Sequence, residues 1–209
     1  MPSIASTCHS IQRREEPRDR YFTPPKVVDL AIEMVGKTSN EEVWWEPFCG
    51  DGAYYNKYPL YSRKTYTEID QGLDAFAYNG PADIVCTNPP YSCLTKVFKM
   101  LAEKKPRVVQ LLIGVMNLTI PRRNLMEASG YTLTKLHQLD IKGWFGTSII
   151  VQWEILPPTT TPPAVMFTHT PETFKTPCGG GWVCKERKPD IYINHGGNWV
   201  EKYMSQYND

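Results

Sequence analysis

No stretch of the 209-residue sequence approaches the ~20 consecutive apolar residues that a membrane-spanning helix requires. The first twenty residues also lack the apolar core of a secretory signal peptide. We therefore expect a soluble, intracellular protein with no membrane partner.

An excess of charge of one sign is also absent. The sequence has 23 basic and 22 acidic residues, which gives a formal net charge of +1. Overall electrostatics therefore give no argument for binding a polyanion such as nucleic acid, and any such argument must come from local patches. The apolar content of 41% and the charged content of 22% are ordinary for a globular protein.

The cysteine pattern lacks the spacing of a disulfide framework. Three of the six cysteines lie in or beside apolar runs, where a free thiol behaves as a small buried hydrophobe. Near the C-terminus, Cys178 and Cys184 could bind zinc together with His169 and His195, but no tight ligand pair is present. We expect reduced cysteines and no metal.

The order of periodic segments indicates one domain with two flanking segments. Residues 1–20 are polar and mixed in charge, as expected of a flexible N-terminal arm. Residues 21–156 alternate strands with helices, which predicts an α/β fold with a mostly parallel sheet and a closing antiparallel strand pair. From Pro157 the composition becomes rich in proline and glycine, so residues 157–209 are expected to form a small appendage.

Hydrophobic periodicity predicts the individual elements. Thr23 and Ser92 are expected helix caps, and Pro106 is expected to end the second helix. Helices are predicted over 24–35, 93–105 and 120–130, and strands over 42–48, 64–70, 82–88, 107–115, 131–141 and 146–156.

A glycine turn follows the first predicted strand. The segment EPFCGDG places Glu46 at the strand end and Gly50 and Gly52 in the turn. Glycine lets the backbone approach a ligand closely at the carboxyl end of a strand, where open α/β sheets bind ligands. Glu46 could hold a ligand ammonium group or an ordered water. A plain β-to-α turn would show the same glycines.

Carboxylates follow the second predicted strand. Glu68 could accept hydrogen bonds from both ribose hydroxyls of a nucleoside-containing cofactor. Asp70 competes for this role because residues two apart on a strand share a face, and we favour Glu68. Further on, Asp74 could accept from an exocyclic amine of an adenine ring, with Phe76 against that ring. A solvated strand end and a surface turn are the alternatives for these carboxylates.

The third predicted strand runs directly into Asn88-Pro89-Pro90-Tyr91. Proline fixes φ and has no N–H, so two prolines make a stiff turn whose carbonyls can accept hydrogen bonds. The Asn88 side chain and the Pro89 carbonyl offer two convergent acceptors, which suit an NH2 group. Tyr91 offers a flat face for a planar ring, worth ~1–3 kcal/mol for a nucleobase. A rigid structural turn is the alternative.

This set of groups suits the methylation of a planar amine. An amine on an aromatic ring delocalises its lone pair and is a poor nucleophile. Acceptors that hold both hydrogens out of the ring plane push the nitrogen toward tetrahedral geometry and stabilise the positive charge that develops on it. Attack on a nearby electrophilic methyl group then becomes possible without a metal.

In their order, the segments YFTPP, EPFCGDG, TEID, DAF and TNPPY resemble S-adenosylmethionine-dependent amino-methyltransferases, above all the N6-adenine DNA methyltransferases. The resemblance covers about Tyr21 to Leu156. It implies a Rossmann-like methyltransferase fold, S-adenosylmethionine as cofactor, and nucleic acid, DNA first, as partner. The small chain also resembles a stand-alone phage or viral enzyme.

The resemblance implies roles for individual residues. At the cofactor it places Tyr21, Phe22, Thr23, Glu46, Phe48, Gly50, Gly52, Glu68, Asp74 and Phe76. As catalytic residues it implies Asn88, Pro89, Pro90 and Tyr91. Against the target base it implies Trp144 or Phe145, within KGWFGTSI.

The chain departs from this family in three places. The span after Gly52 is too short for a full helix, and only three residues separate Asp70 from Asp74, so a strand–helix unit is missing there. No recognisable target-recognition domain follows residue 156. A protein partner could supply the missing recognition surface.

Local charge and the chemistry of Asn88-Pro89-Pro90-Tyr91 are compatible with several substrates. We expect Arg122 and Arg123, near the catalytic edge, to contact phosphate, whereas the lysines of helix 93–105 fit a phosphate contact and a solvated face equally. A target base in a duplex would have to flip out.

RNA adenine and a protein glutamine amide also present an NH2 on a planar carbon. A catalytically inactive methyltransferase fold that serves as a binding subunit is the third alternative.

Overall fold

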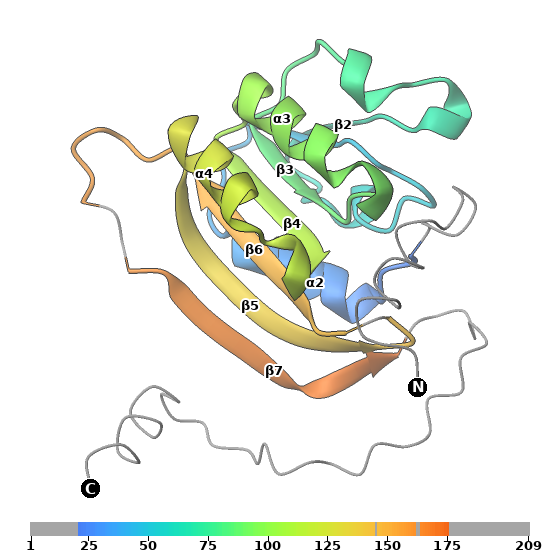
Figure 1. The fold of residues 1–209 in the computed structure, drawn as a ribbon. Coiled ribbons are helices and arrows are strands. Elements are labelled where there is room, and N and C mark those ends of the chain that lie inside the picture. Colours follow the sequence, from blue (N-terminus) through green and yellow to red (C-terminus); the bar gives the residue numbers. More distant parts are fainter. Residues whose placement is uncertain (1–20, 145, 162–163, 176–209) are drawn as a thin grey trace, which may run out of the picture.

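The computed structural model describes residues 21–144, 146–161 and 164–175. Its mixed sheet has seven strands in the order β2-β1-β3-β4-β6-β5-β7 (Figure 1). The expected N-terminal arm, Phe145 and most of the expected appendage, with Cys178, Cys184 and His195, lie outside the described residues.

Four parallel strands form one half of the sheet. They are β1 (Val43–Glu46), β2 (Arg63–Tyr66), β3 (Ile84–Thr87) and β4 (Val108–Gly114). All residues of β1 and β3 are buried, as expected for central parallel strands that are covered on both faces. The predicted parallel sheet is confirmed.

The other half of the sheet is mostly antiparallel. The strand β6 (Ser148–Glu154) pairs antiparallel with β4 and with β5 (Thr132–Lys142), which confirms the predicted closing pair. A further strand, β7 (Met166–Lys175), lies parallel to β5. It comes from the segment expected to be an appendage, so the end of the sheet does not coincide with Pro157.

A histidine joins β7 to its neighbour. The two ring nitrogens of His137, on β5, lie 2.6 Å and 2.7 Å from the hydroxyl oxygens of Thr168 and Thr170 on β7. Burial and the neighbouring His169 lower the pKa of His137. The neutral ring can donate to one hydroxyl and accept from the other, so both contacts hold β7 at the sheet edge.

Helices cover both faces of the sheet (Figure 1). The helix α2 (Pro25–Val35) lies on one face, and α3 (Leu94–Lys104) and α4 (Ile120–Ala128) lie on the other. Side chains alternate between faces along a strand, so Trp44 packs with the α2 layer and Trp45 with the α3 layer. Every helix within the described segments is too short or too polar to traverse a bilayer.

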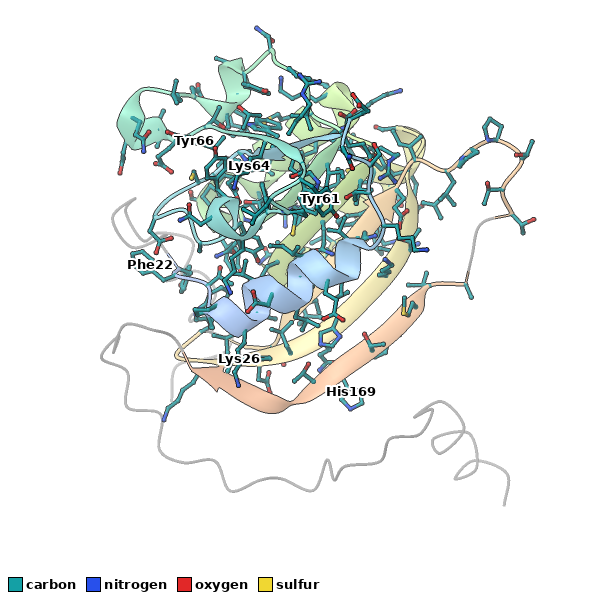
Figure 2. The ribbon with its side chains drawn as sticks, turned by 180° about the vertical axis from the view of Figure 1, so that it is seen from behind. Phe22, Lys26, Tyr61, Lys64, Tyr66 and His169 are labelled. Atoms are coloured by element: carbon teal, nitrogen blue, oxygen red, sulfur yellow. The ribbon has the colours of Figure 1, made fainter. Side chains whose placement is uncertain are left out.

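The two connections on either side of β2 are short. Only the 3₁₀ turn η2 (Tyr55–Lys57) lies between β1 and β2, and only η3 (Ile69–Gln71) and η4 (Ala75–Ala77) lie between β2 and β3. The predicted loss of a helix and of a strand–helix unit is therefore observed. As a result β2 is an edge strand, at the opposite end of the sheet from β7. Figure 2 shows Lys64 and Tyr66 of β2 at one side of the sheet and His169 of β7 at the other.

Candidate active site

The predicted site residues gather where the parallel strands end. In a parallel sheet, the carboxyl ends of neighbouring strands meet at one edge. The glycine turn follows β1, Glu68 follows β2, and the Asn88 turn follows β3. The strand order therefore brings these three segments to one edge of the sheet.

The glycine turn has a backbone that favours glycine. Gly50 and Gly52 have φ values of +53° and +86°, in the left-handed region. A Cβ atom on Gly52 would come within 2.7 Å of the Asn56 side-chain nitrogen, and the Gly52 N–H donates to the Cys49 carbonyl at 2.8 Å. The backbone conformation therefore favours glycine at position 52, and any larger residue would also displace the Asn56 side chain.

Glu68 lies directly against this turn. Its Oε2 accepts from the Gly50 N–H at 2.5 Å, and its Oε1 accepts from the Asp70 N–H at 3.2 Å. Asp70 is exposed in the 3₁₀ turn η3. Between the two carboxylates that the sequence left in competition, the structure brings Glu68 to the glycine turn.

Two aromatic rings lie at a tilted angle to each other beside the next carboxylate. Asp74 accepts from the Phe76 N–H at 2.9 Å and so holds the short turn η4. The rings of Phe48 and Phe76 lie 6.3 Å apart at 56°, and the Lys96 ammonium group lies 5.3 Å from the Phe76 centroid. The structure thus brings Phe48, from the glycine turn, close to Phe76, which was expected with Asp74 at an adenine ring.

Sequence reasoning missed two apolar side chains in the same loop. Ile69 is 68% exposed and Leu73 is 45% exposed, next to the exposed Phe76. A loop that exposes three large apolar side chains beside carboxylates is suited to a ligand with an apolar ring and polar edges. The sequence signal was available, since Ile69 is an apolar residue directly after Glu68, at the end of a strand.

Glu46 faces inward from the end of β1. Its carboxylate accepts from the Thr87 hydroxyl at 2.5 Å, from the Phe48 N–H at 3.0 Å and from the Tyr58 hydroxyl at 3.4 Å. Burial raises the pKa of Glu46 to about 7, and the nearby Glu68 adds to the rise, while the three hydrogen bonds oppose it. The observed partners of Glu46 are therefore protein groups, which join the end of β1 to the end of β3.

This burial predicts a pH dependence of stability. The pKa of Glu46 in the folded protein lies above the value of about 4.3 for an unfolded chain, so the folded state binds the proton more tightly. The resulting stability is fully present below pH ~4.3 and is lost as the pH rises through about 7, by about 1.4 kcal/mol per pKa unit. Urea unfolding at pH 4 to 8 should show this loss in wild type and not in Glu46→Gln. Parallel pH curves for the two proteins would contradict the assignment.

The Asn88 amide has a fixed orientation. Its Nδ2 donates to the Tyr21 carbonyl at 3.0 Å and to the Thr23 hydroxyl at 3.3 Å. A backbone carbonyl can only accept a hydrogen bond, so the atom that faces Tyr21 must be the amide nitrogen. The Oδ1 atom of Asn88 is buried and has no hydrogen-bond partner among the described residues. The turn therefore presents one buried acceptor oxygen without a donor.

The segment before α2 thus has a contact that the sequence did not reveal. Thr23 was expected to cap α2, but the helix cap is Pro24 and the Thr23 hydroxyl accepts from Asn88. Its expected contact with a cofactor stays a prediction. Thr23 is only 5% exposed. Phe22, beside it, is 42% exposed, so it is open to a ligand while its neighbour supports the Asn88 turn. Figure 2 labels Phe22 just before α2.

Aromatic rings surround the Asn88 turn. The Tyr21 ring lies 5.7 Å from the Tyr91 ring at 30° and 5.2 Å from the Trp144 ring at 57°. The structure therefore brings Trp144 to the site, while Phe145 lies outside the described residues. Within the turn itself, the Pro90 carbonyl accepts from the Cys93 N–H at 3.4 Å.

The two predicted phosphate contacts differ in their surroundings. Arg123 forms an ion pair with Glu127, one turn later on α4, at 3.0 Å. Arg122 donates to the Asn117 carbonyl at 2.8 Å and to the Thr95 hydroxyl at 3.4 Å. The described hydrogen bonds and ion pairs connect neither arginine to the Asn88 turn.

The sequence matches no protein-family model and no curated protein sequence. Among solved structures, the chain is similar to a Listeria monocytogenes protein assigned to the class I S-adenosylmethionine-dependent methyltransferases. The TM-score is 0.55 and the sequence identity is 12%, over 79% of this chain and 70% of that chain. This similarity shows the fold, and it confirms the predicted Rossmann-like methyltransferase fold.

Two weaker structural similarities accompany it. One is to a precorrin-6y C5,15-methyltransferase from Geobacter metallireducens, with a TM-score of 0.43 and 14% identity over 61% of this chain and 86% of that chain. The other is to a protein-(glutamine-N5) methyltransferase from Alicyclobacillus acidocaldarius, with a TM-score of 0.35 and 14% identity over 66% of this chain and 98% of that chain.

Proposed function

We propose that the chain is an enzyme that transfers a methyl group from S-adenosylmethionine to the N6 amino group of adenine in DNA. The observation that carries this proposal is the orientation of the Asn88 amide. Its nitrogen is held by Tyr21 and Thr23, and its buried Oδ1 has no partner among the described residues. A buried acceptor without a donor is costly, so it fits a donor that arrives with a substrate.

The residues after β1 and β2 suit the cofactor. The carboxylate of Glu68 would accept from the ribose hydroxyls, beside the glycine turn that it already contacts. Phe48, Phe76 and the exposed Ile69 would enclose the adenine ring. When bound, the cofactor supplies an electrophilic methyl group.

The residues after β3 would prepare the amine. The Oδ1 atom of Asn88 would accept one hydrogen of the target amino group and the Pro89 carbonyl the other, while Tyr91 supports the base by stacking. Both acceptors draw the nitrogen lone pair out of conjugation and stabilise the positive charge that develops on nitrogen. Because Nδ2 is held by two protein groups, Asn88 need not reorient when the substrate arrives.

The distribution of charge at this edge favours a polyanionic substrate. Acidic side chains are exposed in the turns after β1 and β2, at Asp51, Asp70 and Asp74. Basic side chains lie on α3 and α4, which follow β3 and β4, at Lys96, Lys99 and Arg122, and at the end of β5, at Lys142. This separation of acidic from basic side chains supports nucleic acid over a protein glutamine amide as substrate, because the phosphates would approach from the basic side.

The experiment that tests the proposal follows the methyl group. Labelled S-adenosylmethionine is incubated with the full chain and with separate pools of DNA, RNA and protein. We expect label in DNA. Label in protein alone would overturn the adenine proposal, label in RNA alone would replace DNA by RNA, and no transfer to any pool would favour an inactive binding subunit.

A further inference from the structure

A groove separates the two helices that cover one face of the sheet. It lies between α3 and α4, which run side by side in Figure 1, and has a volume of about 360 Å³. Its lining consists of Thr95, Phe98, Lys99, Thr119, Pro121, Arg122 and Leu125. Because α3 begins directly after the Asn88 turn, the groove adjoins the candidate active site.

Arg122 is the most informative residue of the groove. Its guanidinium group lies 5.7 Å from the Phe98 ring centroid and donates to the Asn117 carbonyl and the Thr95 hydroxyl. Burial lowers its pKa, but an arginine stays charged under any ordinary condition. All of these partners are uncharged, so the groove contains a half-buried cation whose charge they do not neutralise.

The other arginines that form ion pairs differ in this respect. Arg107 pairs with Glu42 at 2.5 Å and Arg123 pairs with Glu127 at 3.0 Å. Within the described part of the chain, no carboxylate forms an ion pair with Arg122. A partly desolvated charge without a counter-ion is unfavourable, and an anion that enters the groove would relieve that cost.

The remaining lining suits a phosphate group. Lys99 is exposed on α3, one turn after Thr95, and adds a second positive charge. Thr95 and Thr119 carry hydroxyl groups that can donate to anionic oxygens. The floor, which includes Phe98 and Leu125, is apolar and can accommodate a sugar ring.

We propose that the groove between α3 and α4 binds a phosphodiester group of the nucleic acid strand that carries the target base. This proposal rests on the proposed function, because it assumes a nucleic acid substrate. It assigns Lys99 and Arg122 to the phosphate and leaves Arg123, which already pairs with Glu127, outside the contact. The groove would hold the strand next to the nucleotide that flips toward Asn88.

The test measures the binding of a random-sequence DNA duplex by fluorescence anisotropy over a series of salt concentrations. Each phosphate contact contributes about −0.9 to the slope of log affinity against log salt. Lys99→Ala is therefore expected to flatten the slope by about 0.9 and to weaken binding about fivefold at low salt. Lys105→Ala is the matched control, since it removes the same charge from the exposed far end of α3.

Three results would overturn the proposal. The slope of log affinity against log salt could change equally in Lys99→Ala and in Lys105→Ala. Wild type could also fail to bind DNA. Inorganic phosphate at constant ionic strength is expected to displace DNA from wild type more readily than from Lys99→Ala, and equal displacement from both proteins would be the third contradicting result. Methyl transfer to adenine by wild type is measured separately, so that a wrong groove and a wrong function give different results.

Discussion

Asn88→Ala should lower the turnover number for methyl transfer by about 10²–10³-fold, the range seen when one preorganised hydrogen-bonding group at a developing charge is removed. The affinity for S-adenosylmethionine should fall much less than the turnover number, because Asn88 does not contact the glycine turn and reaches the expected cofactor residues Tyr21 and Thr23 only through hydrogen bonds to the segment before α2. Single-turnover kinetics and a separate titration of the cofactor would measure the two effects. An equal loss in turnover number and in cofactor affinity would indicate a folding defect.

Thr23 offers a matched control for this result. Thr23→Ser keeps the hydroxyl that accepts from Asn88 Nδ2 and should retain activity, whereas Thr23→Val removes it. The Tyr21 carbonyl still holds the amide in Thr23→Val, so the expected loss in turnover is only about fivefold. If Thr23→Val and Asn88→Ala both left turnover unchanged, the amide would have no part in the reaction.

Glu68→Ala should weaken the binding of S-adenosylmethionine by about 10–100-fold, because hydrogen bonds to a charged group are worth about 1.5–3 kcal/mol. The same change removes the acceptor of the Gly50 N–H, so part of the loss would come from a less ordered glycine turn. Glu68→Gln keeps one acceptor oxygen and should give an intermediate affinity. Isothermal titration with cofactor measures all three proteins.

Asp70→Ala is the control for the carboxylate assignment. Asp70 is exposed two residues after Glu68, and the two carboxylates have the same charge. We expect Asp70→Ala to bind cofactor nearly as well as wild type. Wild-type affinity in Glu68→Ala together with a loss in Asp70→Ala would reverse the assignment.

The sequence was sufficient for the parts of the site that depend on strand ends. The glycine turn, Glu68 and the Asn88 turn each follow an apolar run, and parallel strands bring such segments to one edge. The missing units between β1, β2 and β3 were also predictable, because their spans are too short for a helix and a strand. Local pattern therefore predicted the candidate residues at the strand ends, and the strand order places them at a common edge.

The contacts between distant segments could not be predicted in this way. The Thr23 hydroxyl and the Asn88 amide are separated by 65 positions, and only the packing of α2 against the sheet brings them together. The inward orientation of Glu46 depends equally on Thr87 and Tyr58 from other segments.

The strand β7 was missed for a different reason. Its sequence contains Pro171 and follows a proline-rich stretch, which normally argues against a strand. An edge strand tolerates proline, because one side of its backbone has no partner in the sheet. The position of β7 beside β5 became clear only from the strand order.

The most direct test of the central claim is the chemical identity of the methylated product. DNA is incubated with S-adenosylmethionine and wild type or Asn88→Ala, digested to nucleosides and examined by mass spectrometry. We expect N6-methyldeoxyadenosine with wild type and its near absence with Asn88→Ala. A methyl group on a ring carbon, or N6-methyldeoxyadenosine formed equally well by both proteins, would contradict it.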